Sequence, residues 1–224
     1  MEVLLKAEED PEAKANKRRE LAAIYGKMEH RRADAVRLYG DLFESSPDDW
    51  EIRKIFVRLS RELGEQTEAA RRFEAVRAAL ALKADDADAQ GRTLDRADAA
   101  LRRDILLELG ELLQRDLARP QEAERAFGEV LERDETNQVA YEALEKLLLA
   151  REGFAELFAF YRRRVDAVFN QDEQRMLLER MVGIAVERLQ DRASAIQTAE
   201  ELHELYPEDV QVIESLAGMY AAGE

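Results

Sequence analysis

The feature that most constrains the fold is a pattern of apolar and small residues whose spacing recurs three times along the chain. In each copy, 10 residues separate the first position from the second, and 12 more lead to the last. The three sets are Tyr25, Ala35, Tyr39, Leu42 and Pro47; Leu113, Ala123, Phe127, Val130 and Glu135; and Ala185, Ala195, Ala199, Leu202 and Pro207. Such a coincidence predicts that the chain repeats one structural unit.

The clearest copy is the stretch 109–137, LGELLQRDLARPQEAERAFGEVLERDETN. It reads as a helix, a tight turn, a second helix that starts at Pro120, and a short acidic exit. Apolar residues at 3.6-residue spacing predict further helices at 11–27, 32–45, 50–63, 67 onward, 137–151, 154–169, 172–189, 193–206 and 210–221. We therefore expect an all-α chain of about eleven helices joined by short turns.

Several short motifs resemble the tetratricopeptide repeat, whose unit follows the pattern W-x2-L-G-x2-Y, A-x3-F and P. The matches are Leu109-Gly110 with Leu113, Ala123-x3-Phe127, Ala35-x3-Tyr39 with Pro47, Ala69-x3-Phe73, and Leu216-Ala217-x2-Tyr220. At the Trp position the sequence departs from the family and has mostly Leu, Ile or Tyr. The resemblance implies a right-handed α-solenoid of stacked antiparallel helix pairs, and a segment of a larger bacterial-type array.

The resemblance covers nearly the whole chain, which we interpret as a single solenoid over residues 1–224. The expected units are 11–47, 48–84, 93–136, 137–171 and 172–207, followed by a terminal helix at 209–221. Pro47 and Glu135 are 88 residues apart, whereas Glu135 and Pro207 are 72 apart, so 16 extra residues lie in the earlier stretch. We place them in a protruding helical hairpin at 80–103, with its tip near 85–91.

Neither end of the chain reads as the polar cap that a solenoid normally needs. Residues 1–10 are typical of the tail of a helix, and the last helix would leave Ile213, Leu216 and Tyr220 as an unpaired apolar stripe. We expect either that the chain is a segment of a longer repeat array or that its uncapped ends self-associate.

The charge of the chain argues against several classes of partner. Its 34 Lys and Arg against 49 Asp and Glu give a formal net charge of −15, which disfavours nucleic acid and anionic membranes. No apolar run approaches the ~18–20 residues that span a bilayer, and we do not expect the acidic stretch at residues 1–14 to be a signal peptide. Cysteine is absent, which excludes disulfides and thiolate metal sites but permits either redox compartment. The expected location is cytoplasmic.

No motif in the sequence indicates catalysis, and we expect a protein that is not an enzyme. There is no G-x-S-x-G, no phosphate-binding glycine loop and no HExxH. The two histidines, His30 and His203, lie far apart, so neither a metal site nor a cofactor is expected and both are interpreted as surface residues. Large apolar residues at helical spacing are interpreted as core: Trp50, Phe56, Phe73, Phe127, Phe154, Leu157, Phe158, Tyr161 and Met181.

The concave face implied by the resemblance is the candidate binding surface. The groove-lining positions, carried over helix by helix, are Arg19, Ala23, Lys54, Arg58, Arg61, Glu108, Glu111, Glu142, Lys146, Glu179 and Gly183. The Asn residues with which some family members clamp a C-terminal carboxylate are missing, so we do not predict that activity. The groove is basic in its N-terminal third and acidic later, which suits a peptide of opposite polarity. The alternative is that these residues are solvated charges in a chain that is 37% charged.

The sequence therefore predicts a non-catalytic protein–protein interaction scaffold that binds a peptide or protein segment on its concave face. The alternative is a structural spacer or self-assembly element, which would act through the solenoid ends or the 80–103 hairpin. A third interpretation is an enzyme or its regulatory domain, with any catalytic part outside this chain.

Overall fold

The computed structural model describes residues 10–221, and all regular elements in this range are helical. Its eleven α-helices are α2 (Pro11–Lys27), α3 (Arg32–Ser45), α4 (Trp50–Leu63), α5 (Gln66–Ala89), α6 (Arg96–Glu111), α7 (Pro120–Leu131), α8 (Gln138–Ala150), α9 (Phe154–Ala167), α10 (Gln171–Ile184), α11 (Arg192–Leu205) and α12 (Val210–Ala221). A 3-10 helix (Glu29–Arg31) precedes α3, and π-helical turns at Leu112–Asp116 and Ala185–Leu189 continue α6 and α10. The predicted all-α fold is confirmed; the helix tail expected in residues 1–9 lies outside the described range.

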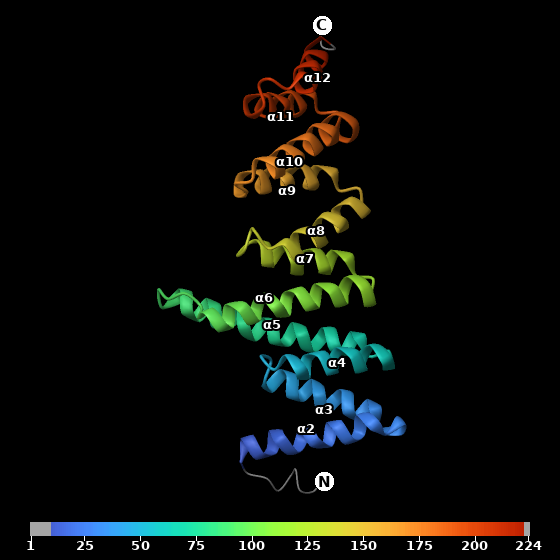
Figure 1. Ribbon diagram of the computed structural model, residues 1–224. Coiled ribbons are helices and arrows are strands. Elements are labelled where there is room, and N and C mark those ends of the chain that lie inside the picture. Colours follow the sequence, from blue (N-terminus) through green and yellow to red (C-terminus); the bar gives the residue numbers. More distant parts are fainter. Residues whose placement is uncertain (1–9, 222–224) are drawn as a thin grey trace. The chain divides into compact units, whose positions relative to one another are not determined.

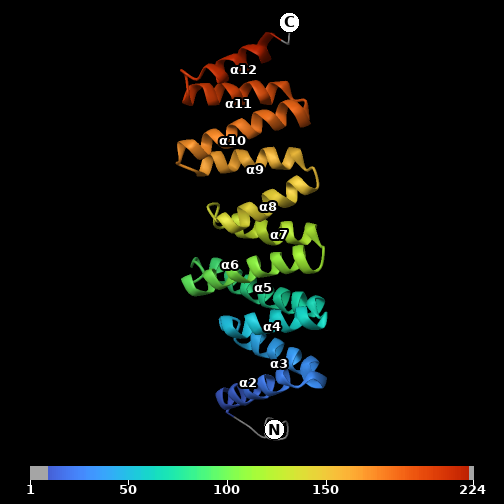
Figure 2. The same ribbon diagram turned by 45° about the vertical axis from the view of Figure 1, so that its right-hand side comes forward.

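Within each part of the chain, successive helices pack against each other, from α2 to α6 and from α8 to α12, so the chain runs back and forth in pairs (Figure 1). The same succession is visible in the turned view (Figure 2). The contacts divide the chain into two compact units, one that extends up to Glu129 and one that starts at Val130. The predicted sequential pairing of helices is therefore confirmed, while the residue ranges assigned to single repeats stay a prediction.

Local sequence explains where most of the helices start. In the described range, seven side chains accept hydrogen bonds from backbone N–H groups in the first turn of the next helix: Asp10, Asp49, Asp95, Asn137, Asn170, Asp191 and Asp209. Such caps satisfy donors that have no partner within the helix. At the other end of α4, Gly64 has a φ of +77°, a left-handed conformation that favours glycine.

The positions that recur in the sequence form the core of both units. All of the first four positions of each set are buried: Tyr25, Ala35, Tyr39, Leu42, Leu113, Ala123, Phe127, Val130, Ala185, Ala195, Ala199 and Leu202. Alanine at a helix crossing allows two backbones to approach, and aromatic rings fill the space beside it. The ring of Phe43 lies 5.8 Å from that of Phe56 and 4.6 Å from that of Phe73, centroid to centroid, which ties α3, α4 and α5 together.

The predicted core residues are buried, with one clear exception. Phe56, Phe73, Phe127, Leu157, Tyr161 and Met181 are buried, and Phe154 and Phe158 pack half-buried against the core of the second unit. The prediction is wrong for Trp50, which is 55% exposed. The reason is its position: Trp50 is the first residue of α4 and shares the exposed face that carries Lys54 and Arg58.

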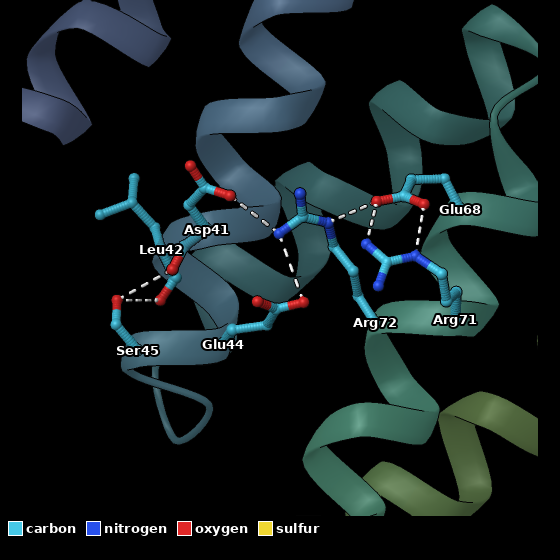
Figure 3. A network of polar contacts seen from close by, with 7 residues as sticks. All are labelled: Asp41, Leu42, Glu44, Ser45, Glu68, Arg71 and Arg72. Carbon is cyan, nitrogen blue, oxygen red and sulfur yellow. Dashed lines mark hydrogen bonds and ion pairs between the residues drawn. The ribbon is translucent and has the colours of Figure 1, made fainter.

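A buried arginine on α5 fastens α5 to α3. Arg72 Nη1 lies 2.9 Å from Asp41 Oδ1 and 3.4 Å from Glu44 Oε1, while its Nε donates to Glu68 Oε1 at 2.9 Å (Figure 3). The guanidinium lies directly against Gly40, where an added Cβ would be 2.6 Å from Arg72 Nε. At this helix crossing a buried cation therefore occupies a place where an apolar side chain is usual, and three carboxylates neutralise its charge.

The residues expected to form an extended hairpin lie at the junction of α5 and α6. Helix α5 has 24 residues and continues to Ala89, so residues 90–95 form the turn, slightly later than the expected tip at 85–91. The end of this hairpin reaches past α3 and α4 in both views (Figures 1 and 2). Leu80, Ala84 and Ala87 are buried along α5, and Lys83 pairs with Asp98 of α6 at 3.1 Å.

Candidate peptide-binding groove

An open groove of about 520 Å³ lies between α4 and α6, the first helices of two successive pairs. Its lining residues are Trp50, Arg53, Lys54, Val57, Arg58, Arg61 and Glu62 from α4 and Glu108 and Glu111 from α6. The structure thus brings together five of the candidate peptide-binding residues: Lys54, Arg58, Arg61, Glu108 and Glu111. These residues lie close together although α4 and α6 are far apart in the sequence, because α5 runs back to the side on which α4 starts.

Helical spacing aligns the residues of each wall. On α4, Trp50, Lys54, Arg58 and Arg61 follow one another at intervals of four, four and three residues, so they lie along one face. Glu108 and Glu111 are three residues apart on α6, which places their carboxylates on adjacent turns. The groove therefore has a mainly basic wall and an acidic wall.

A buried arginine forms the floor between the two walls. Arg53 is 7% exposed, donates from Nη1 to the carbonyl of Pro47 at 2.9 Å, and places Nε 3.2 Å from Glu108 Oε1. Burial raises the pKa of Glu108, the nearby charges of Asp104 and Glu111 raise it further, and only Arg53 opposes them. The Glu108 carboxylate is thus incompletely stabilised by its one cation, which favours additional positive charge at this wall.

The rim of the groove combines an exposed indole with charged side chains. Lys54 Nζ lies 5.1 Å from the centre of the Trp50 ring, a cation–π geometry. At the other end of α4, Arg61 Nε donates to Asp116 Oδ2 at 2.8 Å, across to the π-helical turn that continues α6. This ion pair commits Arg61 to a partner within the chain.

The remaining candidate in the first unit, Arg19, does not line the groove. Its guanidinium pairs with Asp49, the residue that caps α4. The charge of Arg19 nevertheless acts on Tyr39, as does the charge of Arg58. Burial raises the pKa of Tyr39, and the charges of Arg58 and Arg19 both oppose that change.

The two candidates on α8 belong to the second unit, and both are exposed. Glu142 accepts a hydrogen bond from Gln138 Nε2 at 3.0 Å, whereas no contact is recorded for Lys146 within the described range. Neither is among the residues that line the groove of the first unit. A smaller cavity of about 230 Å³ in the second unit lies among α10, α11 and α12 and includes Glu179. A binding role for Glu142 and Lys146 stays a prediction.

Sequence reasoning missed four lining residues: Trp50, Arg53, Val57 and Glu62. Trp50 was assigned to the core because it is large and aromatic. The missed signal is its spacing, since Trp50 stands four residues before Lys54 and eight before Arg58 and so shares their face. No comparable sequence pattern marks Arg53 as a lining residue, because its partner Glu108 lies 55 residues away along the chain.

The groove differs in charge from the chain as a whole. Four cations line it, Arg53, Lys54, Arg58 and Arg61, against the three carboxylates Glu62, Glu108 and Glu111. The difference of one positive charge stands against a net −15 for the whole chain. A local reversal of sign favours encounter with a ligand that carries negative charge.

Neither histidine suggests a metal centre. His30 is exposed in the short 3-10 helix, while His203 is only half-exposed on α11, with a buried Nδ1 that has no hydrogen-bond partner in the described range. Among residues 10–221, no group of three or more His, Asp or Glu is arranged to hold a metal ion. None of the helices described here combines the length and the apolarity needed to cross a bilayer.

Comparison with known proteins gives similarity to solved structures but not to family models or curated proteins. No family model and no curated protein matches the sequence. Among solved structures, the crystal structure of PilW, a widely conserved type IV pilus biogenesis factor, is similar with a TM-score of 0.34 and 14% sequence identity, over 90% of this chain and 98% of that chain. The class of the protein, an all-α chain of sequentially paired helices, is evident from its own structure.

Proposed function

We propose that this chain is a non-catalytic protein-interaction scaffold and that the groove between α4 and α6 binds a peptide or protein segment. One observation carries the proposal: Trp50, Lys54 and Arg58 on α4 share an open groove with Glu108 and Glu111 on α6. Tryptophan and arginine are enriched among the residues that dominate protein interfaces. The groove combines both with charges of each sign.

The size and the lining of the groove support a peptide ligand. A volume of about 520 Å³ lies within the range of roughly 300–1,000 Å³ that is typical of ligand sites. The groove is open along α4, which suits a chain segment that continues beyond it. Among the described residues, those that line it include no histidine, serine or threonine, so they offer no hydroxyl nucleophile beside a histidine base.

Affinity purification with quantitative mass spectrometry tests this proposal. The whole chain is compared with Trp50→Ala and with Arg58→Glu, which alter exposed positions of the groove. The control is Arg163→Glu, the same charge reversal at an exposed position of α9 in the second unit. Partners of the groove are expected to be lost with both groove variants and retained with the control. Unchanged recovery with both groove variants would sink the proposal.

Self-association is a second candidate, because α12 exposes several apolar side chains. Val210 is 63% exposed, Ile213 43% and Tyr220 48%. Light scattering on the wild type and on Val210→Ser/Ile213→Ser tests whether this face joins two copies. A concentration-dependent mass that the double substitution abolishes supports self-association, and a monomeric mass at all concentrations contradicts it.

A further inference from the structure

Two cations on the α4 wall, Lys54 and Arg58, donate no hydrogen bond to a carboxylate among the described residues. The ammonium group of Lys54 lies over the Trp50 ring. The nearest carboxylate oxygen recorded for Arg58 belongs to Glu62, 3.9 Å from its Nε, which is beyond hydrogen-bonding distance. The side chain of Arg58 is 65% exposed. Both cations are therefore available to a ligand.

The spacing of these cations suits one shared carboxylate. Lys54 and Arg58 are four residues apart on α4, which corresponds to about 6 Å along the helix axis and nearly the same angular position. A carboxylate placed between them could accept from both, and hydrogen bonds between ionised groups are the stronger kind. One ligand residue with a single negative charge is thus sufficient to contact both Lys54 and Arg58.

An apolar contact surface adjoins the cations. The indole of Trp50 begins the same face of α4 and is 55% exposed, and Val57 lies half-buried beside it in the groove lining. An aromatic or large aliphatic side chain of the ligand could cover this surface. The apolar contact and the charged contact would then come from neighbouring ligand residues.

The opposite wall sets the orientation of the ligand. Glu111 is half-buried on α6 and forms no ion pair recorded for the described part of the chain. It stands one turn from Glu108, for which Arg53 is the only cationic partner within residues 10–221. This wall repels a carboxylate and attracts a base. A bound segment would therefore direct its acid toward α4 and its base toward α6.

We propose that the groove binds a segment of a partner protein in which a carboxylate adjoins an aromatic or large apolar residue, with a basic side chain on the opposite flank. The carboxylate contacts Lys54 and Arg58, the apolar side chain covers Trp50, and the base contacts Glu111. This inference rests on the proposed function of the groove and adds the chemistry of its ligand.

Selection from a displayed library of random peptides, with the whole chain as bait, tests this inference. The expected result is enrichment of Asp or Glu next to Trp, Phe or Leu. Arg58→Glu is expected to weaken the selected peptides by on the order of tenfold or more, because it replaces a charged hydrogen bond with repulsion. Arg163→Glu, which reverses one charge far along the chain at an exposed site, is expected to leave binding within about twofold.

A charge exchange gives a sharper test of the contact. Replacing the acid of a selected peptide with lysine should abolish its binding to the wild type and restore binding to Arg58→Glu. Such a rescue measures the pairwise interaction, which a general disturbance of the fold cannot imitate. Circular dichroism of Arg58→Glu checks that the helices remain intact.

The outcomes separate this inference from the function on which it rests. If the selected peptides lose binding with Trp50→Ala but show no preference for acids, the ligand chemistry is wrong and the groove still binds peptides. If no peptide is enriched, or if neither Trp50→Ala nor Arg58→Glu alters binding, the proposed function itself is wrong.

Discussion

Gly110 of α6 lies directly against the ring of Phe127 of α7, so closely that a Cβ on Gly110 would be 2.6 Å from Phe127 Cζ. Both residues are buried, and they belong to the best-preserved copy of the repeated pattern. The absence of a side chain at position 110 is what allows the large ring to reach the backbone of α6. This contact explains why glycine and phenylalanine stand at these positions of the stretch 109–137.

Gly110→Ala is therefore expected to destabilise the protein by about 1–3 kcal/mol, the usual cost of overpacking a core. The matched control is Gly128→Ala on α7, where an added Cβ would meet no atom within 4 Å. There the same substitution is expected to stabilise by about 0.5–1 kcal/mol, because alanine favours the helix. Urea unfolding of both variants measures the difference. Equal effects of the two substitutions would contradict the contact.

Two adjacent arginines on α5 should differ in their importance, although both bond to Glu68. Arg72 is buried and reaches the carboxylates of α3, whereas the side chain of Arg71 is 61% exposed. Arg72→Met is expected to lower the free energy of unfolding by about 1–3 kcal/mol, since it removes charged hydrogen bonds at a helix crossing. Arg71→Met serves as the control and should change the melting temperature much less. A larger effect of Arg71→Met would overturn this assignment.

The same network of Glu68 with Arg71 and Arg72 should make the stability of the fold depend on pH in the acidic range. The hydrogen bond from Arg71, with a further contribution from Arg72, lowers the pKa of Glu68 from 4.5 to about 2 despite the opposing effect of burial. Because the pKa is lower in the folded state, the stabilisation is present above pH 4.5 and is lost as the pH falls toward 2. The difference in stability between wild type and Glu68→Gln should therefore shrink over this range.

Denaturation series at several pH values between about 6 and 2 measure this difference. Glu204→Gln is a suitable control, because it removes an exposed carboxylate of α11 for which no ion pair is recorded in the described range. Its difference from the wild type should show no comparable trend. A constant difference for Glu68→Gln across the range would refute the role of the network.

Two tyrosines in the second unit should respond in opposite ways to loss of their hydroxyl groups. Tyr161 donates to Glu145 Oε1 at 2.6 Å, and burial together with this bond raises the pKa of Tyr161 to about 12. The hydroxyl of Tyr141 is buried with no hydrogen-bond partner among the described residues, and burial raises its pKa as well. Tyr161→Phe should cost about 1 kcal/mol, whereas Tyr141→Phe should be neutral or stabilising.

Thermal unfolding of the two variants compares these effects directly. The aromatic ring is retained in both, so the packing of Tyr141 beneath the guanidinium of Arg164, 4.8 Å from the ring centre, is preserved. Destabilisation of similar size in both variants would show that the Tyr141 hydroxyl has a partner.

Trp50 is the only tryptophan of the chain and can report on the groove by fluorescence. Because its side chain is 55% exposed, its emission should resemble that of an indole in water and be quenched readily by acrylamide. A peptide bound in the groove should shift the emission to shorter wavelength and reduce quenching. An emission typical of a buried indole in the free protein would contradict the exposed position.

Local sequence determined the helices. Capping residues such as Asp10 and Asp49, together with the apolar periodicity, predicted the starts and ends of α2, α3, α4 and α12 at the observed residues. The recurring spacing also identified core positions such as Ala123 and Phe127. These features are predictable because helix formation depends on hydrogen bonds and side-chain contacts within four residues along the chain.

Tertiary packing decided which faces of those helices remained open. Periodicity cannot show that Trp50 stays exposed, because exposure depends on which neighbouring helix covers that face. The same holds for the groove, whose floor depends on the meeting of Arg53 with Glu108, 55 residues later in the chain. The sequence by itself thus determined an all-α chain of paired helices and the candidate charges, and only the packing of α4 beside α6 assembled five of them into one site.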